Sequence, residues 1–308
     1  YFEGTGEGKL QEHLRFAISK DAKDWYALNN NRPIVSSDTI STSGGIRDPL
    51  FLRGADGCYY IVATDMNTVK NGWKDNPGIV MMRSADLVHW SHSKIVLKEA
   101  YKNFADAYWV WAPQTIYDRK AKKYMVYFTL QRTGDGRKSL ITYYAYANNN
   151  FTGFESEPKV LFSAKYGSID NDIIERNGVY HLFYKGNIKN AEGKEIQNGI
   201  QMATAKKLTG PWKEDFKFID AYANQKTGVE GSGVFPLNDG SGYVLMYDLY
   251  GSGRYEYQTS RDLKTFTQKP QSFRKDFAPR QGTCLLYPCD AADEPLCVEP
   301  VGRRILLK

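Results

Sequence analysis

Three acidic residues of this chain stand at the head of short apolar runs, each near glycine, serine or proline. Asp48 lies in Gly-Gly-Ile-Arg-Asp-Pro, Asp170 in Gly-Ser-Ile-Asp-Asn-Asp, and Glu230 in Gly-Val-Glu-Gly-Ser-Gly. A single Asp-Pro step is usually an ordinary turn, and proline favours an extended conformation for the residue before it. None of the three acids therefore indicates a function by itself, and their meaning depends on whether the fold brings them together.

Converging carboxyl groups suit the hydrolysis of a glycosidic bond. One carboxylate acts as general base on a water molecule, and a protonated carboxyl acts as general acid on the leaving oxygen. A third acid near the general acid raises its pKa by like-charge repulsion, so that it keeps its proton near neutral pH. Aromatic residues that could form apolar walls for a sugar ring, or simply pack between strands, are Trp73, Phe104, Trp109 and Trp111.

A recurring landmark divides the chain into similar units. It consists of a small or hydroxyl residue, a short polar turn and an aromatic residue, and its aromatic positions are Trp25, Trp90, Phe154, Trp212 and Phe266. Units of about 60 residues are too long for helical repeats and fit four-stranded propeller blades. Each interval holds four short β-rich runs between Gly, Asn and Asp turns, with no long stretch of helical periodicity. The last run of the fourth interval is expected at Phe266–Gln268.

The two ends of the chain predict how the ring closes. After the fifth landmark there is one clear strand, Thr283–Tyr287, and a weaker candidate at Leu296–Val298. Near the N-terminus, two predicted strands do not belong to any of the four intervals. They are Leu14–Ile18 and Trp25–Leu28. These N-terminal strands would complete the last blade and remove exposed edges. We therefore predict an all-β, five-bladed β-propeller that forms a single domain over residues 1–308.

The repeat predicts where the acids lie. The innermost strands of a propeller begin around the same end of its central channel, so residues at equivalent positions converge on one funnel. Counted from the landmarks, the residues at the heads of the five innermost strands are Asp48, Trp111, Asp170, Glu230 and Arg280. Because three of these five residues are acidic, we favour a shared functional role over the alternative that each acid merely stabilises its own turn.

Composition excludes several classes of function. The formal net charge of +6 comes without a basic run or an RNA-binding aromatic motif, so nucleic acid is not an expected partner. No apolar run approaches the length of a membrane span. No secretory signal is visible at the start, and we expect a secreted or periplasmic monomer whose leader is absent. Three of the four cysteines, which could form one local disulfide or remain free thiols, are Cys284, Cys289 and Cys297.

Five motifs, in order, resemble those of glycoside hydrolase family 43, whose members are five-bladed β-propellers acting on arabinose- and xylose-containing glycans. The motifs are Arg47-Asp48-Pro49, Trp111-Ala112-Pro113, Ser168-Ile169-Asp170, Val229-Glu230-Gly231 and Pro279-Arg280-Gln281-Gly282-Thr283. The resemblance implies that Asp48 is the base, Asp170 tunes and orients the acid, and Glu230 is the acid. It also implies inversion of the anomeric configuration, without a covalent intermediate. The expected substrate contacts are Trp109, Trp111, Arg280, Gln281 and Phe104.

Two positions depart from the family pattern. Gln281 stands where family members often have a histidine that helps to hold a water or a metal, so we expect no metal and no cofactor. Asn171 replaces the proline that usually follows the tuning acid, which leaves Asp170 and Asp172 as alternatives on one strand face. Asp170 is preferred because it lies nearer the strand mouth.

Several functions remain open on the sequence. The leading hypothesis is an exo-acting α-L-arabinofuranosidase; β-xylosidase and endo-acting xylanase or arabinanase are alternatives within the family. A related fructan-cleaving family shares the Arg-Asp-Pro motif, but its other motifs do not occur here. Outside enzymes, a glycan-binding propeller without catalysis is the main rival, followed by a purely structural interaction propeller. The choice among substrates depends on the loops Thr68–Pro77 and Asn187–Asn198.

Overall fold

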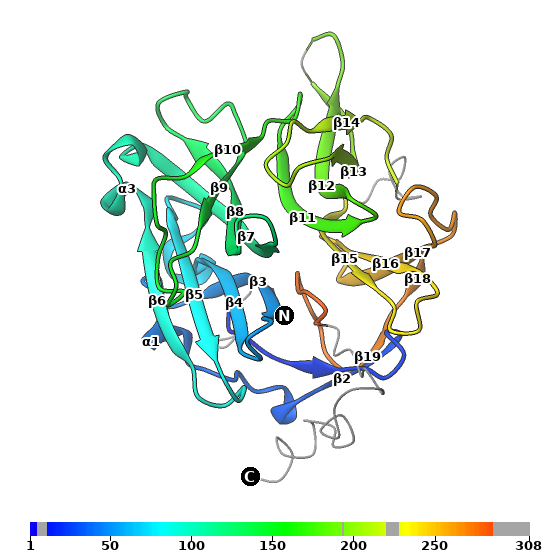
Figure 1. Ribbon diagram of the computed structural model, residues 1–308, viewed down its shortest axis with the longest axis horizontal. Coiled ribbons are helices and arrows are strands. Elements are labelled where there is room, and N and C mark those ends of the chain that lie inside the picture. The colour runs from blue at the N-terminus through cyan, green and yellow to red at the C-terminus, as the bar shows by residue number, and fades with distance from the viewer. Residues whose placement is uncertain (5–10, 193, 220–227, 286–308) are drawn as a thin grey trace.

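The chain folds into five small β-sheets arranged in a ring, so the predicted five-bladed β-propeller is confirmed (Figure 1). The computed structural model describes residues 1–4, 11–192, 194–219 and 228–285. Four sheets have four strands each, and in each of them the strands follow one another in sequence order. The first strand of each of these blades lies nearest the centre of the ring, so the chain crosses every blade from the inside outward (Figure 1).

The four-stranded blades follow the predicted intervals closely. The first contains β3 (Ile46–Arg53), β4 (Tyr59–Asp65), β5 (Gly78–Ser84) and β6 (Ser91–Val96). The second contains β7 (Ala107–Asp118), β8 (Lys123–Arg132), β9 (Ile141–Tyr146) and β10 (Lys159–Phe162). The third contains β11 (Ser168–Arg176), β12 (Val179–Lys189), β13 (Glu195–Ala205) and β14 (Lys213–Asp215). The fourth contains β15 (Glu230–Pro236), β16 (Tyr243–Leu249), β17 (Arg254–Ser260) and β18 (Gln271–Ser272).

Two strand predictions need correction in detail. The last strand of the fourth blade is β18 and not Phe266–Gln268, because Phe266 makes only an isolated bridge to Ser260 and is otherwise buried as a packing residue. The segment Asn187–Asn198, expected as a loop, is largely the extended hairpin of β12 and β13. A hairpin of this length is stabilised by its own ladder of backbone hydrogen bonds, which a composition of polar residues does not reveal.

The fifth blade joins both ends of the chain, as predicted. Its strands are β1 (Ala17–Ile18), β2 (Asp24–Ala27) and β19 (Arg274–Lys275). β19 pairs with β2 in parallel, and Arg274 also forms an ion pair with Asp24. Residues 283–285 of the predicted strand Thr283–Tyr287 form no regular strand. The rest of that strand and Leu296–Val298 lie outside the described residues.

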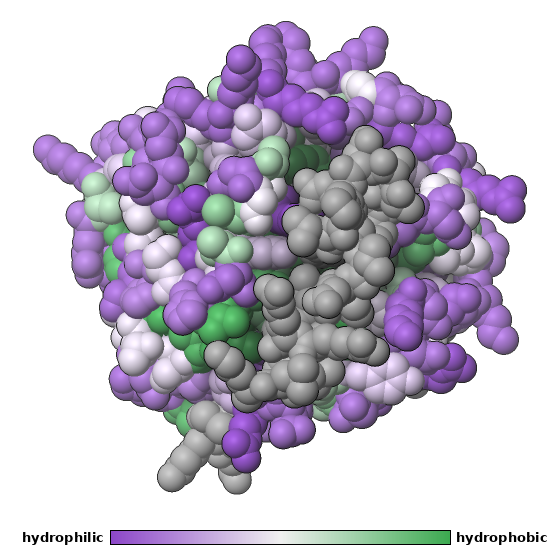
Figure 2. Space-filling model, turned by 60° about the horizontal axis from the view of Figure 1, so that its bottom comes forward, coloured by the Kyte–Doolittle hydropathy of each residue, from purple (hydrophilic) through white to green (hydrophobic). Residues whose placement is uncertain are grey.

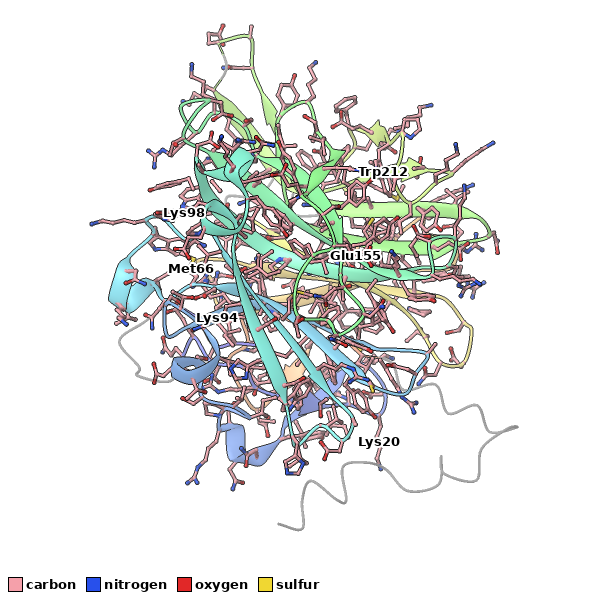
Figure 3. All side chains as sticks on the ribbon, turned by 60° about the vertical axis from the view of Figure 1, so that its left-hand side comes forward. Lys20, Met66, Lys94, Lys98, Glu155 and Trp212 are labelled. Carbon is pink, nitrogen blue, oxygen red and sulfur yellow. The ribbon has the colours of Figure 1, made fainter. Side chains whose placement is uncertain are left out.

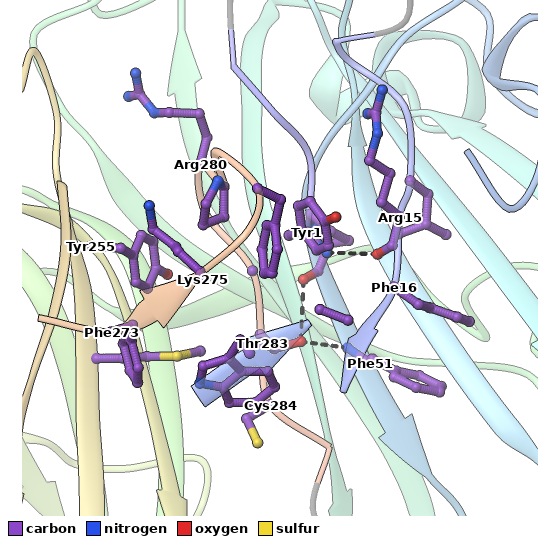
Figure 4. Close-up of a pocket in the computed structure, with 18 residues that line it drawn as sticks. Tyr1, Arg15, Phe16, Phe51, Tyr255, Phe273, Lys275, Arg280, Thr283 and Cys284 are labelled. Carbon is purple, nitrogen blue, oxygen red and sulfur yellow. Dashed lines mark hydrogen bonds between the residues drawn. The ribbon is translucent and has the colours of Figure 1, made fainter. Parts of the chain in front are cut away.

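The segment after β19 nevertheless runs along the centre of the ring. The Arg280 backbone N–H donates to the carbonyl of Phe2 at 2.8 Å. The Thr283 hydroxyl donates to the carbonyl of Pro49 at 3.2 Å and accepts from the N–H of Phe51 at 2.8 Å (Figure 4). The C-terminal segment is thus tied to the innermost strand of the first blade, and this contact closes the ring.

The landmark turns have a common physical basis. In the first blade the Asp86 carboxylate accepts from the N–H groups of Val88 and His89, and the Ser84 hydroxyl accepts from Leu87 N–H. Serine and aspartate favour such turns because their side chains replace a backbone acceptor. The same arrangement occurs at Ser260 and Asp262, and Leu87 and Leu263 share a positive φ of 67° and 60°.

Helices are few and short in the described part of the chain. They are α1 (Ser37–Ile40), α2 (Thr68–Asn71), α3 (Leu97–Ala100) and the 3₁₀ turns η1 (Asn29–Asn31) and η2 (Lys102–Phe104). None of them is long and apolar enough to cross a membrane. Side chains fill the space between neighbouring sheets (Figure 3), and the face seen in Figure 2 is mainly hydrophilic. Cys58 and Cys284 are free thiols, while Cys289 and Cys297 lie outside the described residues.

Asp172 provides a test of how the blades are joined. It lies on β11, is only 8% exposed, and accepts a hydrogen bond of 2.7 Å from the Val234 N–H of the next blade. Burial raises the pKa of Asp172 to about 6. The folded protein therefore holds this proton more tightly than the unfolded chain does, and the resulting stability declines as the pH rises from about 4 to 6.

The Asp172→Asn variant keeps an acceptor for Val234 N–H but cannot ionise. We expect its free energy of unfolding, relative to the wild type, to rise by up to about 3 kcal/mol between pH 4 and pH 7.5. Urea unfolding of both proteins at the two pH values measures this difference, because all other titrating groups are shared. A difference that does not change with pH would contradict the assignment.

Candidate active site

The innermost strands of four blades share a β-bulge near their first residues. The pairing register shifts between Arg47 and Leu50, Trp111 and Gln114, Ile169 and Asp172, and Glu230 and Gly233. Each bulge contains one residue with positive φ, and these residues are Asp48 (51°), Ala112 (45°), Asp170 (55°) and Gly231 (66°). A bulge bends its strand and re-aims the side chain that it carries.

The conformation of Asp48 differs from the one its sequence context predicts. Proline at 49 favours an extended residue 48, yet Asp48 has a φ of 51°. The bulge decides the outcome because it requires a left-handed residue, and aspartate tolerates that region better than most. Pro49 then sits where the ladder is interrupted, so its missing N–H costs no hydrogen bond.

The acids are not all at equivalent positions, which corrects the count made from the sequence. Asp48 and Asp170 are the left-handed residues of their bulges, whereas Glu230 is the residue just before Gly231, which fills that place in the fourth blade. Trp111 likewise precedes the left-handed Ala112. Counting from the landmark turns cannot detect this offset of one residue, because it depends on where the bulge falls.

The bulges bring the predicted acids together. Asp48 and Asp170 line one narrow pocket at the centre of the ring, together with Ala112, Gln281 and Thr283. Glu230 lies beside the pocket, where the neighbouring Gly231 forms part of the lining. Burial raises the pKa of both aspartates, and the charge of Glu230 adds to the effect in each case.

A short chain of hydrogen bonds holds the Asp48 carboxylate. The Ala112 N–H donates to the Thr64 hydroxyl oxygen at 2.8 Å, so the hydroxyl must direct its own proton elsewhere. That proton goes to Oδ2 of Asp48, also at 2.8 Å. Burial raises the pKa of Asp48, while the charge of Arg47 and the Thr64 hydrogen bond oppose that rise. The fold thus positions one carboxylate oxygen and leaves Oδ1 for another partner.

Asp170 connects the third blade to the two that follow. Its Oδ2 accepts from Gly231 N–H at 2.9 Å and from Gln281 Nε2 at 2.8 Å. Its backbone carbonyl accepts from the Ser232 hydroxyl at 2.7 Å. Because Gly231 follows Glu230 directly, Asp170 fixes the backbone that carries the predicted acid. Asp172, the alternative considered from the sequence, contacts Val234 N–H instead and does not line the pocket.

Glu230 lies between two cations. Lys185 Nζ is 3.4 Å from one carboxylate oxygen, and Arg280 Nη2 is 3.4 Å from the other. Arg280 also binds the buried Asp248 through Nε at 2.7 Å. Burial raises the pKa of Asp248 to about 7, although Arg280 opposes that rise. Arg280, predicted as a substrate contact, is therefore part of the ion-pair network around Glu230.

The sequence reading missed three of these partners, which share a place in the fold. Each lies on the second strand of its blade, opposite the residue that precedes a bulge: Thr64 opposite Arg47, Lys185 opposite Ile169, and Asp248 opposite Glu230. The signal that could have found them is a polar residue directly after a run of apolar and aromatic residues in the second strand. Finding it requires the pairing register, and register depends on the bulge.

Three tryptophans form an aromatic cluster, and none of them lines the pocket of Asp48 and Asp170. Trp109 and Trp111 stack at 3.9 Å with an interplanar angle of 15°, and Trp73 meets Trp111 edge-on at 6.2 Å. The Trp111 ring N–H donates to Asn76 at 2.9 Å. Arg47, buried and paired with Glu12, lies over Trp73. Trp73 is 54% exposed, so this cluster keeps apolar surface open to solvent.

Phe104 does not belong to this cluster, in contrast to the sequence prediction. It is only 4% exposed, and it packs against Tyr101 and Tyr143 with Arg132 over its ring. Its aromatic character reflects the core between the first two blades. A side chain buried in this way cannot contact a sugar in the pocket.

Gln281 acts as a hydrogen-bonding group in the pocket. Its amide nitrogen donates to Asp170 at 2.8 Å, which fixes the orientation of the side chain. Within the described ranges no group of three His, Cys, Asp or Glu side chains is placed to hold a metal ion.

A second pocket lies at the fifth blade and differs in character. It is mostly apolar and is lined by residues including Phe16, Phe51, Tyr255, Phe273 and Cys284 (Figure 4). The described residues that line it include no carboxylate. The carboxyl groups of Asp48 and Asp170 lie instead in the narrow pocket.

Comparison with known proteins gives a family for the chain. A family model described as a probable glycosyl hydrolase domain, related to glycoside hydrolase family 43, matches residues 1–288. The chain belongs to this family. The resemblance drawn from the five sequence motifs is therefore confirmed, and family membership supports a hydrolase.

Individual relatives are distant. An α-L-arabinofuranosidase of Bifidobacterium longum is 23% identical over 89% of this chain, which spans only 29% of the length of that protein. An endo-1,4-β-xylanase structure from Bacteroides thetaiotaomicron has a TM-score of 0.60 at 17% identity and covers 88% of this chain and 91% of its own. A GH43_1 enzyme of Xanthomonas citri in complex with xylotriose has a TM-score of 0.58 at 17% identity, covering 79% and 78%. At these identities the structures establish the shared fold.

Thr64 should contribute to stability through the hydrogen bonds at the bulges. In Thr64→Val the buried Ala112 N–H loses its acceptor, and Asp48 loses a donor. We expect the free energy of unfolding to fall by about 1–3 kcal/mol, measured by urea unfolding at pH 7. Thr64→Ser keeps the hydroxyl and should remain close to the wild type. Equal stability of the valine and serine variants would show that these hydrogen bonds are unimportant.

Proposed function

We propose that the chain is an inverting, exo-acting α-L-arabinofuranosidase that acts on arabinose- and xylose-containing plant glycans. The observation that carries the proposal is the convergence of Asp48, Asp170 and Glu230 from three different blades. The two aspartates line one pocket, and Glu230 lies beside it, close enough to interact electrostatically with both. A propeller that only binds glycans has little use for three clustered carboxyl groups, because burying like charges together costs free energy. Family membership supports the hydrolase class.

Asp48 is the proposed general base. One of its oxygens accepts from Thr64, and the other is available to a water molecule that attacks the anomeric carbon. A base works best when its pKa lies near the working pH, and burial moves the pKa of Asp48 upward from its ordinary value. The water loses its proton to Asp48 as its oxygen forms the new bond to carbon.

Glu230 is the proposed general acid, and Asp170 is the group that orients it. The proton of Glu230 passes to the glycosidic oxygen as the bond to the anomeric carbon breaks, and the bonding electron pair stays with that oxygen. Asp170 holds the backbone next to Glu230 through Gly231 N–H. Direct attack by water on the face opposite the leaving group inverts the configuration.

The relatives bear on the choice of substrate. The arabinofuranosidase relative favours arabinose, and the xylanase and xylotriose-bound structures keep xylosidase and endo-xylanase as alternatives. Product analysis on arabinan, arabinoxylan and xylan separates these options. Release of single arabinose residues supports the proposal, whereas xylose or longer oligosaccharides would favour an alternative.

Variants at the two proposed catalytic residues test the mechanism. Asp48→Asn and Glu230→Gln should each lower kcat/KM on an aryl arabinofuranoside with a poor leaving group by about 10²–10⁴-fold. With a strongly activated leaving group, which needs little protonation, the Glu230 variant should recover most of its rate while the Asp48 variant should not. Near-wild-type rates in either variant on the poor substrate would refute the assignment.

Two matched controls accompany these variants. Asp170→Asn removes a carboxylate from the pocket and should reduce activity, whereas Asp172→Asn removes one that faces Val234 on the same strand and should not. The opposite order would mean that Asp172 is the functional acid of β11. Absence of hydrolysis by the wild type on a panel of aryl glycosides would instead favour the glycan-binding propeller.

A further inference from the structure

Lys185 occupies a special place in the repeat of the propeller. It lies on the second strand of the third blade, opposite Ile169, which precedes the left-handed Asp170. The corresponding residues of the first two blades are Thr64 and Thr129, which accept hydrogen bonds from the inner strand of the following blade. At this position the third blade presents an ammonium group, and its partner in the following blade is the proposed acid Glu230.

The Lys185 ammonium is held in place from several sides. Its side chain is 16% exposed, and Nζ lies 4.5 Å from the centre of the Tyr250 ring, a distance suited to a cation–π contact. The Tyr250 hydroxyl accepts from Asn198 at 3.0 Å. Gly228 leaves room for this ring, since a Cβ there would lie 2.0 Å from the Tyr250 hydroxyl. The position of the charge is therefore built into the fold.

The charges that face Glu230 come from every element packed around it. Two cations contact it, Lys185 from β12 and Arg280 from the C-terminal segment. Anionic neighbours interacting with Glu230 are Asp170 of β11, Asp48 of β3 and Asp248 of β16. Arg280 divides its charge between Glu230 and Asp248, whereas Lys185 makes its ion pair with Glu230. Lys185 thus places a positive charge against Glu230 where three other acids lie nearby.

We propose that Lys185 is a positioning residue that orients Glu230 and sets the upper pH limit of hydrolysis. The inference rests on the proposed role of Glu230 as general acid. When Glu230 gives its proton to the glycosidic oxygen, a carboxylate remains, and the ammonium group beside it stabilises that carboxylate. The same charge also limits the pH to which Glu230 remains protonated before the reaction. Lys185 therefore makes Glu230 a stronger proton donor and narrows the pH range in which the enzyme is active.

The variant Lys185→Met tests this role through the pH dependence of kcat/KM. Without the cation Glu230 should keep its proton to higher pH. The basic limb of the pH profile of kcat/KM, where activity falls as the pH rises, should therefore shift upward by about one pH unit or more. Protonation should also be less effective, so the rate on a poor leaving group should fall more than the rate on an activated one. The charge-preserving variant Lys185→Arg should return the limb toward the wild-type position.

Further variants separate this role from a general structural one. Thr129→Val changes the corresponding position of the second blade, away from Glu230, and should leave the basic limb in place. Tyr250→Leu removes the aromatic face under Lys185 and should move the limb in the same direction as Lys185→Met, but less. Lys185→Gln serves if the methionine variant does not fold.

The outcomes distinguish this inference from the proposed function. If Glu230→Gln is inactive on the poor leaving group but the basic limb is unchanged in a folded Lys185→Met or Lys185→Gln protein, the role of Lys185 is wrong and that of Glu230 stands. If Glu230→Gln retains wild-type activity, the proposed role of Glu230 as general acid is wrong, and the inference about Lys185, which rests on it, falls as well. A limb that moves to lower pH in the neutral variants would also overturn the inference.

Discussion

The bulge in each innermost strand is the feature on which the pocket depends. In a regular strand, alternate side chains point into the two faces of the blade, where they pack against neighbouring blades. The extra residue of the bulge breaks this alternation and allows Asp48 and Asp170 to line the central pocket. Left-handed backbone at a non-glycine residue costs of the order of 1–3 kcal/mol. Three such residues, Asp48, Ala112 and Asp170, occur at one site, so other interactions must offset this cost.

Contacts between blades supply that offset. The Ala112 N–H is held by Thr64 of the preceding blade, and the Asn171 side chain is held by Thr129 in the same way. Asp170 in turn holds Gly231 of the fourth bulge, and Arg280 of the closing segment binds Asp248. The bulges of the second, third and fourth blades are thus each stabilised by the blade before them. Since the contacts run around the ring, its closure at the fifth blade also fixes the relative positions of the acids.

Much of this architecture was accessible from the sequence. The landmark turns are local structures in which Ser and Asp side chains bind nearby backbone groups, so their spacing revealed five blades. The Asp-Pro, Ile-Asp and Glu-Gly motifs indicated three residues that the structure brings together: two line one pocket and the third, Glu230, lies beside it. What the turns could not give was the register within each strand pair. For that reason the offset of Glu230, the left-handed φ of Asp48 and the roles of Thr64, Lys185 and Asp248 were not predicted.

Phe104 and the last strand of the fourth blade show a second limit. An aromatic residue near Trp109 fits a sugar-binding wall or a core equally well by type, and only burial distinguishes the two. Phe266 has the composition of a strand, but its ring packs in the core between the third and fourth blades. In both cases tertiary packing decides, and local pattern carries no information about it.

The balance of charge around the pocket bears on catalysis as a whole. Four carboxyl groups, those of Asp48, Asp170, Glu230 and Asp248, meet two cations, Lys185 and Arg280, since the charge of Arg47 is already paired with Glu12. Burial raises the pKa of Asp48, Asp170 and Asp248, so bound protons offset part of this negative charge. The transition state of glycoside hydrolysis develops positive charge on the sugar, and fixed negative charge nearby stabilises it. In the proposed mechanism, cations close to the sugar ring would therefore oppose the reaction. Lys185 and Arg280 are instead each held against the carboxylate of Glu230.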